Sequence, residues 1–259
     1  MESSLAPLAS LLLVFVLGLR HGFDPDHIAV IDGMVYSGLS ERPAVAPWIG
    51  TLFALGHGLM LTVITVVLGV YVAPASIPGA VVTVLAWMPV LLMVAIGCAN
   101  LRNLLGARPY QASGWKLRFV PRCVRSSSHP LAVFAVGVFF ALVFDTATQA
   151  AAWGAAANAR SGPLLPLMIG LSFTAGMVLT DSIDSRIMVR MLARLSDRSQ
   201  ALAYRRKVGW IIVTMSFGIA LYSAVTLFLP DAEPGDTAMS VAGLAANAPA
   251  SVSPPTVIR

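Results

Sequence analysis

Residues 10–36 read SLLLVFVLGLRHGFDPDHIAVIDGMVY, an apolar segment that carries two histidines and three aspartates. The apolar run around it, 5–36, would be about 48 Å long as one helix. A bilayer has a hydrocarbon core of about 30 Å. Proline removes a backbone hydrogen bond and disfavours helix at the residue before it, so we expect one pass with a break near Pro25. Two passes are the alternative, but they would reverse the charge pattern described below.

The composition indicates that lipid covers much of the chain. It is 57% hydrophobic and 11% charged, with a mean hydropathy of +0.80, whereas soluble domains carry about 25% charged residues. One span needs about 20 mostly apolar residues, so 259 residues allow six or seven passes and no large soluble domain. We predict an all-α integral membrane protein with about six transmembrane helices, the first of them broken. The long apolar runs are 5–36, 48–72, 79–100, 131–153, 163–185 and 208–229.

Basic residues concentrate in two segments between apolar runs. The net charge is +5, and most of the 17 lysines and arginines lie in 101–130 and 185–207. Lysine and arginine collect in cytoplasmic loops of membrane proteins. We therefore expect loops 101–130 and 186–207 to be cytoplasmic in an inner (plasma) membrane, with both termini outside, and we expect no nucleic-acid partner.

The basic loop divides the predicted helices into two groups of three. The expected parts are a first half (1–100), the loop (101–130), a second half (131–229) and a disordered tail (230–259) rich in Ala, Pro, Ser and Gly. An odd number of helices per half makes the halves antiparallel, as in transporters built from inverted repeats. Phe23-Asp24 in the first half is echoed by Phe144-Asp145 in the second.

Ionisable residues within the apolar runs point to a bound cation. Burying an aspartate in the membrane costs about 2.5–3.5 kcal/mol, so the six found here would cost about 15–20 kcal/mol without compensation. Arg20 is the one obvious basic counterion in the runs. A divalent cation in a polar cavity is the simplest compensation. The aspartates are Asp24, Asp26, Asp32, Asp145, Asp181 and Asp184, and the histidines are His21, His27 and His57.

The densest cluster lies in the first run. On a regular helix His21 and Asp24 share a face, as do Asp24 and His27, because residues three apart are neighbours. A break at Pro25 could instead bring His21, Asp26 and His27 around one point. Imidazole binds Ni, Co, Cu and Zn, and carboxylates suit harder ions. The mixed set predicts a site for Ni²⁺ or Co²⁺.

Three further segments carry candidate metal ligands. His57 lies between Gly56 and Gly58, which would let another helix approach closely. Asp145 begins the segment DTATQ. Asp181 and Asp184 are three apart and share one helix face.

Structural roles are the alternatives for several of these residues. His57 could form a hydrogen bond between helices, and so could Asp145. Asp32, near the end of its run, reads better as an interfacial charge than as a ligand. Asp184 could pair with Arg186. The cluster from His21 to His27 has no comparably simple structural explanation.

Four motifs in order resemble those of the nickel/cobalt transporter family (NiCoT, or NicO). The matching segments are Arg20–Ile28, Leu55–Gly58, Asp145–Gln149 and Gly176–Asp184. The departures are Gly22, Pro25, Gly58, Gln149 and Ser182. The resemblance implies uptake of Ni²⁺ or Co²⁺ through the inner membrane, with His21, Asp26 and His27 as the prime metal contacts. Family members usually have eight helices, so the resemblance is to a short member.

We therefore expect a permease driven by the membrane potential, without a cofactor. No Gly-x-x-x-x-Gly-Lys-Ser/Thr loop is present, so we expect no ATP hydrolysis. Metal efflux on the same scaffold is the first alternative. Exporters that resemble the family often carry a His-rich cytoplasmic loop, and 101–130 contains only His129. An intramembrane metal-dependent hydrolase is a remote alternative, because its expected His-Glu-x-x-His motif is missing.

Overall fold

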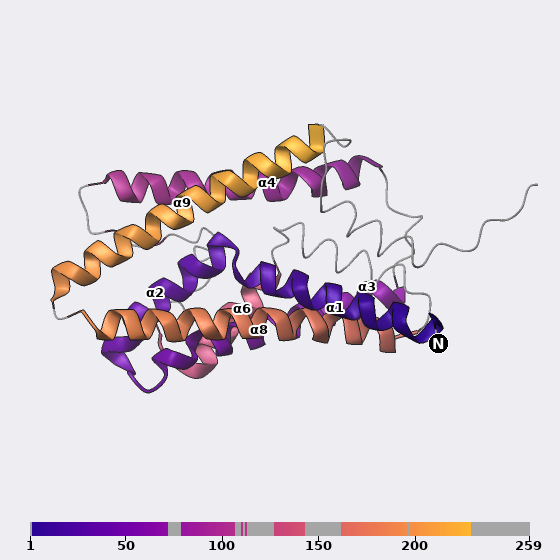
Figure 1. Ribbon diagram of the computed structural model, residues 1–259, viewed down its shortest axis with the longest axis horizontal. Coiled ribbons are helices and arrows are strands. Elements are labelled where there is room, and N and C mark those ends of the chain that lie inside the picture. Colours follow the sequence, from indigo (N-terminus) through magenta and orange to yellow (C-terminus); the bar gives the residue numbers. More distant parts are fainter. Residues whose placement is uncertain are drawn as a thin grey trace, which may run out of the picture.

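The structure, a computed structural model, describes residues 2–71, 79–106, 110, 112, 127–142, 162–195 and 197–228. Within these segments the chain forms α-helices and one short 3₁₀ helix, with no β-strand (Figure 1). The elements are α1 (Glu2–Gly22), α2 (Pro25–Glu41), η1 (Ala46–Trp48), α3 (Ile49–Tyr71), α4 (Gly79–Leu105), α6 (Pro130–Ala141), α8 (Leu164–Ala193) and α9 (Arg198–Phe228).

The predicted break in the first span is confirmed. Helices α1 and α2 meet at an angle of 55° across Phe23 and Asp24. Asp24 has an extended backbone (φ −63°, ψ 141°), the conformation that a following proline imposes, and Pro25 takes the first position of α2. The amides of Phe23 and Asp24 bond to carbonyls three residues back, at 3.0 and 2.9 Å, which tightens the last turn of α1. The span therefore bends where Pro25 forbids a continuous helix.

The number of spans agrees with the predicted all-α membrane architecture. Four described helical segments are long and apolar enough to cross a bilayer, and the bent pair α1–α2 makes a fifth span. Helix α6 is a shorter apolar helix that covers the first part of the predicted run 131–153. Positions 143–153 of that run, most of loop 101–130 and the predicted disordered tail lie outside the described residues.

The prediction that residues 186–207 form a loop is wrong. Helix α8 continues to Ala193 and α9 begins at Arg198, so most of the segment is helical. Most arginines of this segment lie on helical turns that extend beyond the apolar runs, and Arg194 caps the end of α8. Arginine is a good helix former, so a run that ends by hydropathy need not end as a helix.

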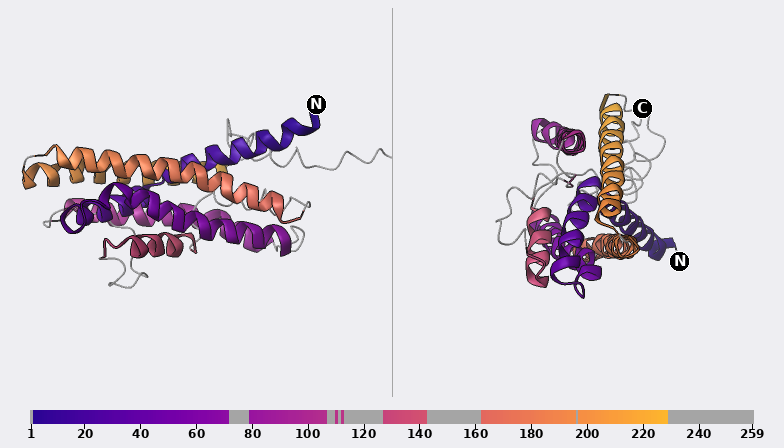
Figure 2. Two further views of the ribbon diagram at one scale, coloured as in Figure 1. Left: turned by 90° about the horizontal axis from the view of Figure 1, so that it is seen from below. Right: turned by 90° about the vertical axis from the view of Figure 1, so that its left-hand side faces the viewer.

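Helix α3 lies at the centre of one layer, packed between α6 and α8, and α1 packs on the other side of α8 (Figures 1 and 2). Helices α4 and α9 form a second pair, which contacts the first layer mainly through α2. Ser128, before α6, donates to Glu41 at the end of α2 (2.9 Å). Ser185 of α8 donates to the carbonyl of Pro47 in η1 (3.1 Å). The segments after α2, before α6 and after α8 therefore share one end of the molecule.

Helices α1 and α8 are joined by a reciprocal contact between glycine and phenylalanine. A Cβ atom on Gly18 would overlap the carbonyl oxygen of Phe173, and a Cβ atom on Gly176 would overlap that of Phe15. Small residues permit this approach, which gains van der Waals contact where lipid provides no hydrophobic driving force. Each helix thus supplies the motif Phe-x-x-Gly to the other.

The same contact joins α3 to α6. A Cβ atom on Gly56 would overlap the carbonyl of Phe134, and one on Gly137 would overlap that of Phe53. The first two spans of each predicted half therefore carry Phe-x-x-Gly, on α1 and α3 in the first half and on α6 and α8 in the second, and each pairs with a helix of the other half. The two halves therefore pack together through α3 and α8. Helix α3 carries the candidate residue His57, and α8 carries Asp181 and Asp184.

Candidate metal centre

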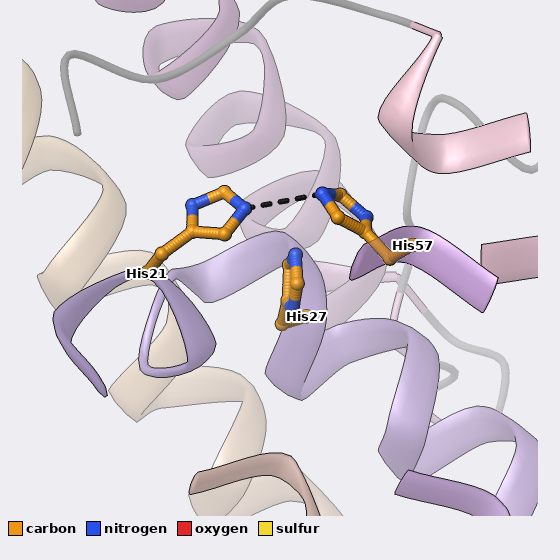
Figure 3. Close-up of side chains that lie close together, drawn as sticks. All are labelled: His21, His27 and His57. Atoms are coloured by element: carbon orange, nitrogen blue, oxygen red, sulfur yellow. Dashed lines mark hydrogen bonds between the residues drawn. The ribbon is translucent and has the colours of Figure 1, made fainter. Parts of the chain in front are cut away.

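Three histidine rings converge where α1 ends, α2 begins and α3 passes (Figure 3). His21, His27 and His57 are all fully buried, and one ring nitrogen from each lies within 4.8 Å of the others. The Nε2 atoms of His21 and His57 are 3.3 Å apart. His27 stands between them, with the nitrogen at the tip of its ring turned towards the other two (Figure 3). Among the described residues these three side chains form a group whose donor atoms lie close enough together to hold a metal ion.

The break in the first span creates this convergence. On one continuous helix, residues six apart are separated by about 240° around the axis and point to different faces. Across the bend, the ring centroids of His21 and His27 are 4.6 Å apart. Gly58 lets α3 pack closely against Thr174 of α8, and His57 of α3 adds the third ring.

Carboxylates contact two of the three rings. Asp24 Oδ2 lies 2.8 Å from His21 Nδ1, and Asp181 Oδ2 lies 3.1 Å from His27 Nδ1. Asp26 is fully buried in the first turn of α2, where its Oδ1 accepts a hydrogen bond from the backbone amide of His27 (3.0 Å). The cluster therefore combines imidazole nitrogens with nearby carboxylate oxygens.

Aromatic side chains close the cluster against the rest of the bundle. The ring of Phe173 lies 5.3 Å from that of His21, and the ring of Phe53 lies 5.1 Å from that of His27. Charges interact more strongly in such a low-dielectric setting than in water. A cation entering the cluster would be attracted strongly by the carboxylates.

Asp184 and Asp145 are placed differently. Asp184 lies one turn beyond Asp181 on α8, and its buried Oδ2 has no hydrogen-bond partner among the described residues. The suggested ion pair with Arg186 does not form: Arg186 donates to the carbonyl of Ser182 (3.1 Å) and lies over the ring of Trp48. Asp145 lies outside the described residues, so its place relative to the cluster stays a prediction.

The interpretation of Asp32 as an interfacial charge is wrong. Asp32 is fully buried, and its Oδ2 accepts hydrogen bonds from Nε and Nη2 of Arg205 at 3.0 and 2.8 Å. Arg205 is therefore the basic partner of Asp32, a role that the sequence analysis did not assign to it. A signal was present: Arg205 precedes the buried residues Val208 and Ile212 by three and seven positions, which is one face of a helix.

Comparison with known proteins supports a transport family. Residues 8–229 match the family model NicO, described as high-affinity nickel-transport protein. The match includes all the histidines and aspartates discussed above. No solved structure matches the chain.

Individual relatives give the same result. The chain is 30% identical over 220 residues to the "High-affinity nickel transport protein" of Cryptococcus neoformans, covering 69% of this chain and 43% of the relative. It is also 30% identical to "Nickel transporter NicT" of Mycobacterium tuberculosis (68% of this chain, 55% of the relative) and to "Cobalt transport protein NhlF" of Rhodococcus rhodochrous (69% and 58%). The chain spans about half the length of the curated relatives it matches. The family match over most of its length nevertheless shows that the chain belongs to the NicO family of high-affinity nickel-transport proteins.

Proposed function

We propose that the chain imports Ni²⁺, or the chemically similar Co²⁺, across the inner (plasma) membrane by secondary transport. One observation carries the proposal: His21, His27 and His57 converge in the buried centre of the helical bundle. Three buried imidazoles whose nitrogens converge on one point form a set of donor atoms that a shared metal ion can bridge. The names of the relatives, which include nickel and cobalt transporters, support the same substrate class.

The donor set fits a borderline metal ion. Imidazole nitrogen suits Ni²⁺ and Co²⁺, while carboxylates and water suit harder ions. We assign the first binding step to the three histidines, with His57 closer to the other two than the sequence suggested. Asp26 accepts a hydrogen bond from the backbone amide of His27, and Asp184 and Asp145 are proposed to relay the ion along the path. The metal is the transported substrate and not a resident cofactor.

The driving force proposed is the membrane potential. Moving a divalent cation inward gains about 4.6 kcal/mol per 100 mV, at about 2.3 kcal/mol per charge. We place the basic segments 101–130 and 186–207 on the cytoplasmic side, because positive residues favour that side. The shared end formed by the segments after α2, before α6 and after α8 is consistent with this orientation.

The two halves are proposed to be an inverted repeat. The reciprocal Phe-x-x-Gly contacts support this. In a repeat, α1 corresponds to α6 and α3 corresponds to α8, so the contact between α1 and α8 corresponds to the contact between α6 and α3. In transporters of this kind the substrate site lies at the repeat interface near the middle of the membrane. The histidine cluster lies at such an interface, since His57 packs beside Gly137 of the second half.

Radiolabelled ⁶³Ni²⁺ uptake tests the proposal. Cells that express the chain should accumulate ⁶³Ni²⁺, and His21→Asn, His27→Asn and His57→Asn should each reduce uptake at least tenfold at equal membrane levels of protein. His129→Asn is the matched control, because His129 is exposed and asparagine can keep its capping bond to the amide of Leu131. Wild-type uptake by all three buried variants would rule out the histidine cluster as the binding site.

Vesicles of known orientation test the direction of transport. With an imposed potential, negative on the cytoplasmic side, right-side-out vesicles should load ⁶³Ni²⁺ and collapse of the potential should stop loading. Loading by inside-out vesicles alone would instead indicate efflux.

A further inference from the structure

Two of the three histidines meet a carboxylate through the same ring atom. His21 contacts Asp24 through Nδ1 (2.8 Å), and His27 contacts Asp181 through Nδ1 (3.1 Å). The carboxylates come from unrelated places, because Asp24 lies in the break of the first span and Asp181 lies on α8. The repeated use of Nδ1 is therefore a property of the site and not of one local motif.

The chemistry of the contact selects a tautomer. An ionised carboxylate only accepts hydrogen bonds, and a neutral imidazole carries its proton on one nitrogen. Nδ1 must then be the donor in both rings, and Nε2 keeps its lone pair. Nε2 of His21 is also the atom that faces His57 Nε2 at 3.3 Å.

We infer that Asp24 and Asp181 are positioning residues that hold His21 and His27 as Nδ1–H tautomers, so that the metal ion meets Nε2 nitrogens and not these two carboxylates. The assignment rests on the proposed function. It separates the aspartates by role, since a carboxylate that orients a histidine ligand raises its basicity and fixes its ring without binding the metal itself.

Packing holds Asp181 in the place that this role requires. A Cβ atom on Gly22 would come within 2.9 Å of Asp181 Oδ1, and one on Gly50 would overlap the Asp181 backbone carbonyl. Asp181 is thus confined between α1 and α3 by two glycines, and it is fully buried. A residue that orients a ligand must itself be fixed by its surroundings.

Direct binding of the metal by Asp181 is the competing role. Its Oδ1 has no hydrogen-bond partner among the described residues, so this oxygen would be the ligand. Asparagine separates the two roles, because its side-chain oxygen still accepts a bond from Nδ1–H while the negative charge is lost. Leucine has a similar size and can do neither.

The test uses the purified full-length chain and Ni²⁺ alone. Asp181→Leu should weaken Ni²⁺ binding about 10- to 100-fold, the usual effect of losing such a partner. Asp181→Asn should bind Ni²⁺ at least tenfold more tightly than Asp181→Leu. X-ray absorption of the bound nickel should report the same number of imidazole ligands in wild type and Asp181→Asn. Nitrogen-15 NMR should show His27 protonated on Nδ1 in both proteins and a mixture of tautomers in Asp181→Leu.

Several results would overturn the inference. They are equal loss of affinity in the Asn and Leu variants, loss of an oxygen ligand from nickel in Asp181→Asn, or an unchanged His27 tautomer in Asp181→Leu. If Asp181→Leu does not give monodisperse protein, Asp24→Asn and Asp24→Leu ask the same question of His21. Failure of the proposed function is distinct, because the wild-type chain would then bind no Ni²⁺ at all.

Discussion

Arg205 of α9 donates two hydrogen bonds to a single oxygen of Asp32 on α2, at 3.0 and 2.8 Å, and both side chains are buried. The guanidinium also lies over the ring of Tyr36, 4.2 Å from its centroid. This ion pair connects the second part of the broken span to the α4–α9 pair, which has few other contacts with the first layer. It therefore helps to hold the two layers together.

Loss of one partner of this pair should be costly. Arg205→Leu leaves the Asp32 charge buried without compensation, and such single replacements destabilise by about 3–5 kcal/mol. The double variant Asp32→Leu/Arg205→Leu should be more stable than Arg205→Leu. Thermal unfolding in detergent measures both, with Arg206→Leu as the exposed control. Equal melting temperatures for Arg205→Leu and Arg206→Leu would show that the pair contributes nothing.

The reciprocal glycine contacts should not tolerate a methyl group. Gly56→Ala would push α3 away from the carbonyl of Phe134, and overpacking of this kind costs about 1–3 kcal/mol or more. Gly218→Ala is the control, since nothing lies within 4 Å of a Cβ atom there and alanine favours helix. The melting temperature in detergent should fall for Gly56→Ala and hold or rise for Gly218→Ala. A fall of the same size in both would contradict the packing account.

The bend at Pro25 should be required for metal binding more than for folding. Pro25→Ala removes the restriction that keeps Asp24 extended, so α1 and α2 can approach one continuous helix and His27 rotates away from His21. We expect Ni²⁺ affinity to fall at least tenfold while the protein remains in the membrane. Pro89→Ala, inside α4, is a matched control that should leave affinity unchanged. Normal binding by Pro25→Ala would mean that packing alone holds the bend.

Tyr110 should make the chain sensitive to alkaline pH. Burial, aided by the negative charge of Asp32, raises the pKa of Tyr110 above its usual value of 10.0, and its hydroxyl donates to Asn100 Oδ1 (2.8 Å). A raised folded pKa contributes stability that is complete below pH 10 and is lost as the pH rises through the folded value. Melting temperatures above pH 10 should therefore fall less for Tyr110→Phe than for wild type. Tyr71→Phe, at an exposed position, should follow wild type.

Local sequence was sufficient for several features of the fold and the site. The apolar runs predicted the helices, and Pro25 predicted the bend, because a proline restricts its own residue and the one before it in any context. The cost of burying charge marked His21, His27 and His57 as candidates before their positions were known. These predictions depend on neighbouring residues or on composition, which can be read along the chain.

Long-range contacts were not accessible in this way. The choice of His57 as the third ring, the contact of Asp181 with His27 and the pairing of Arg205 with Asp32 all join residues far apart in sequence. Each depends on how closely two helices approach, and for His57 and Asp181 glycine contacts set that approach. Hydropathy also ended α8 too early and began α9 too late, because it reflects the membrane core and not the hydrogen bonds that continue a helix beyond it. The residue types in the apolar runs thus indicate that buried charged side chains need partners. Only the packing of the helices decides which side chains become those partners.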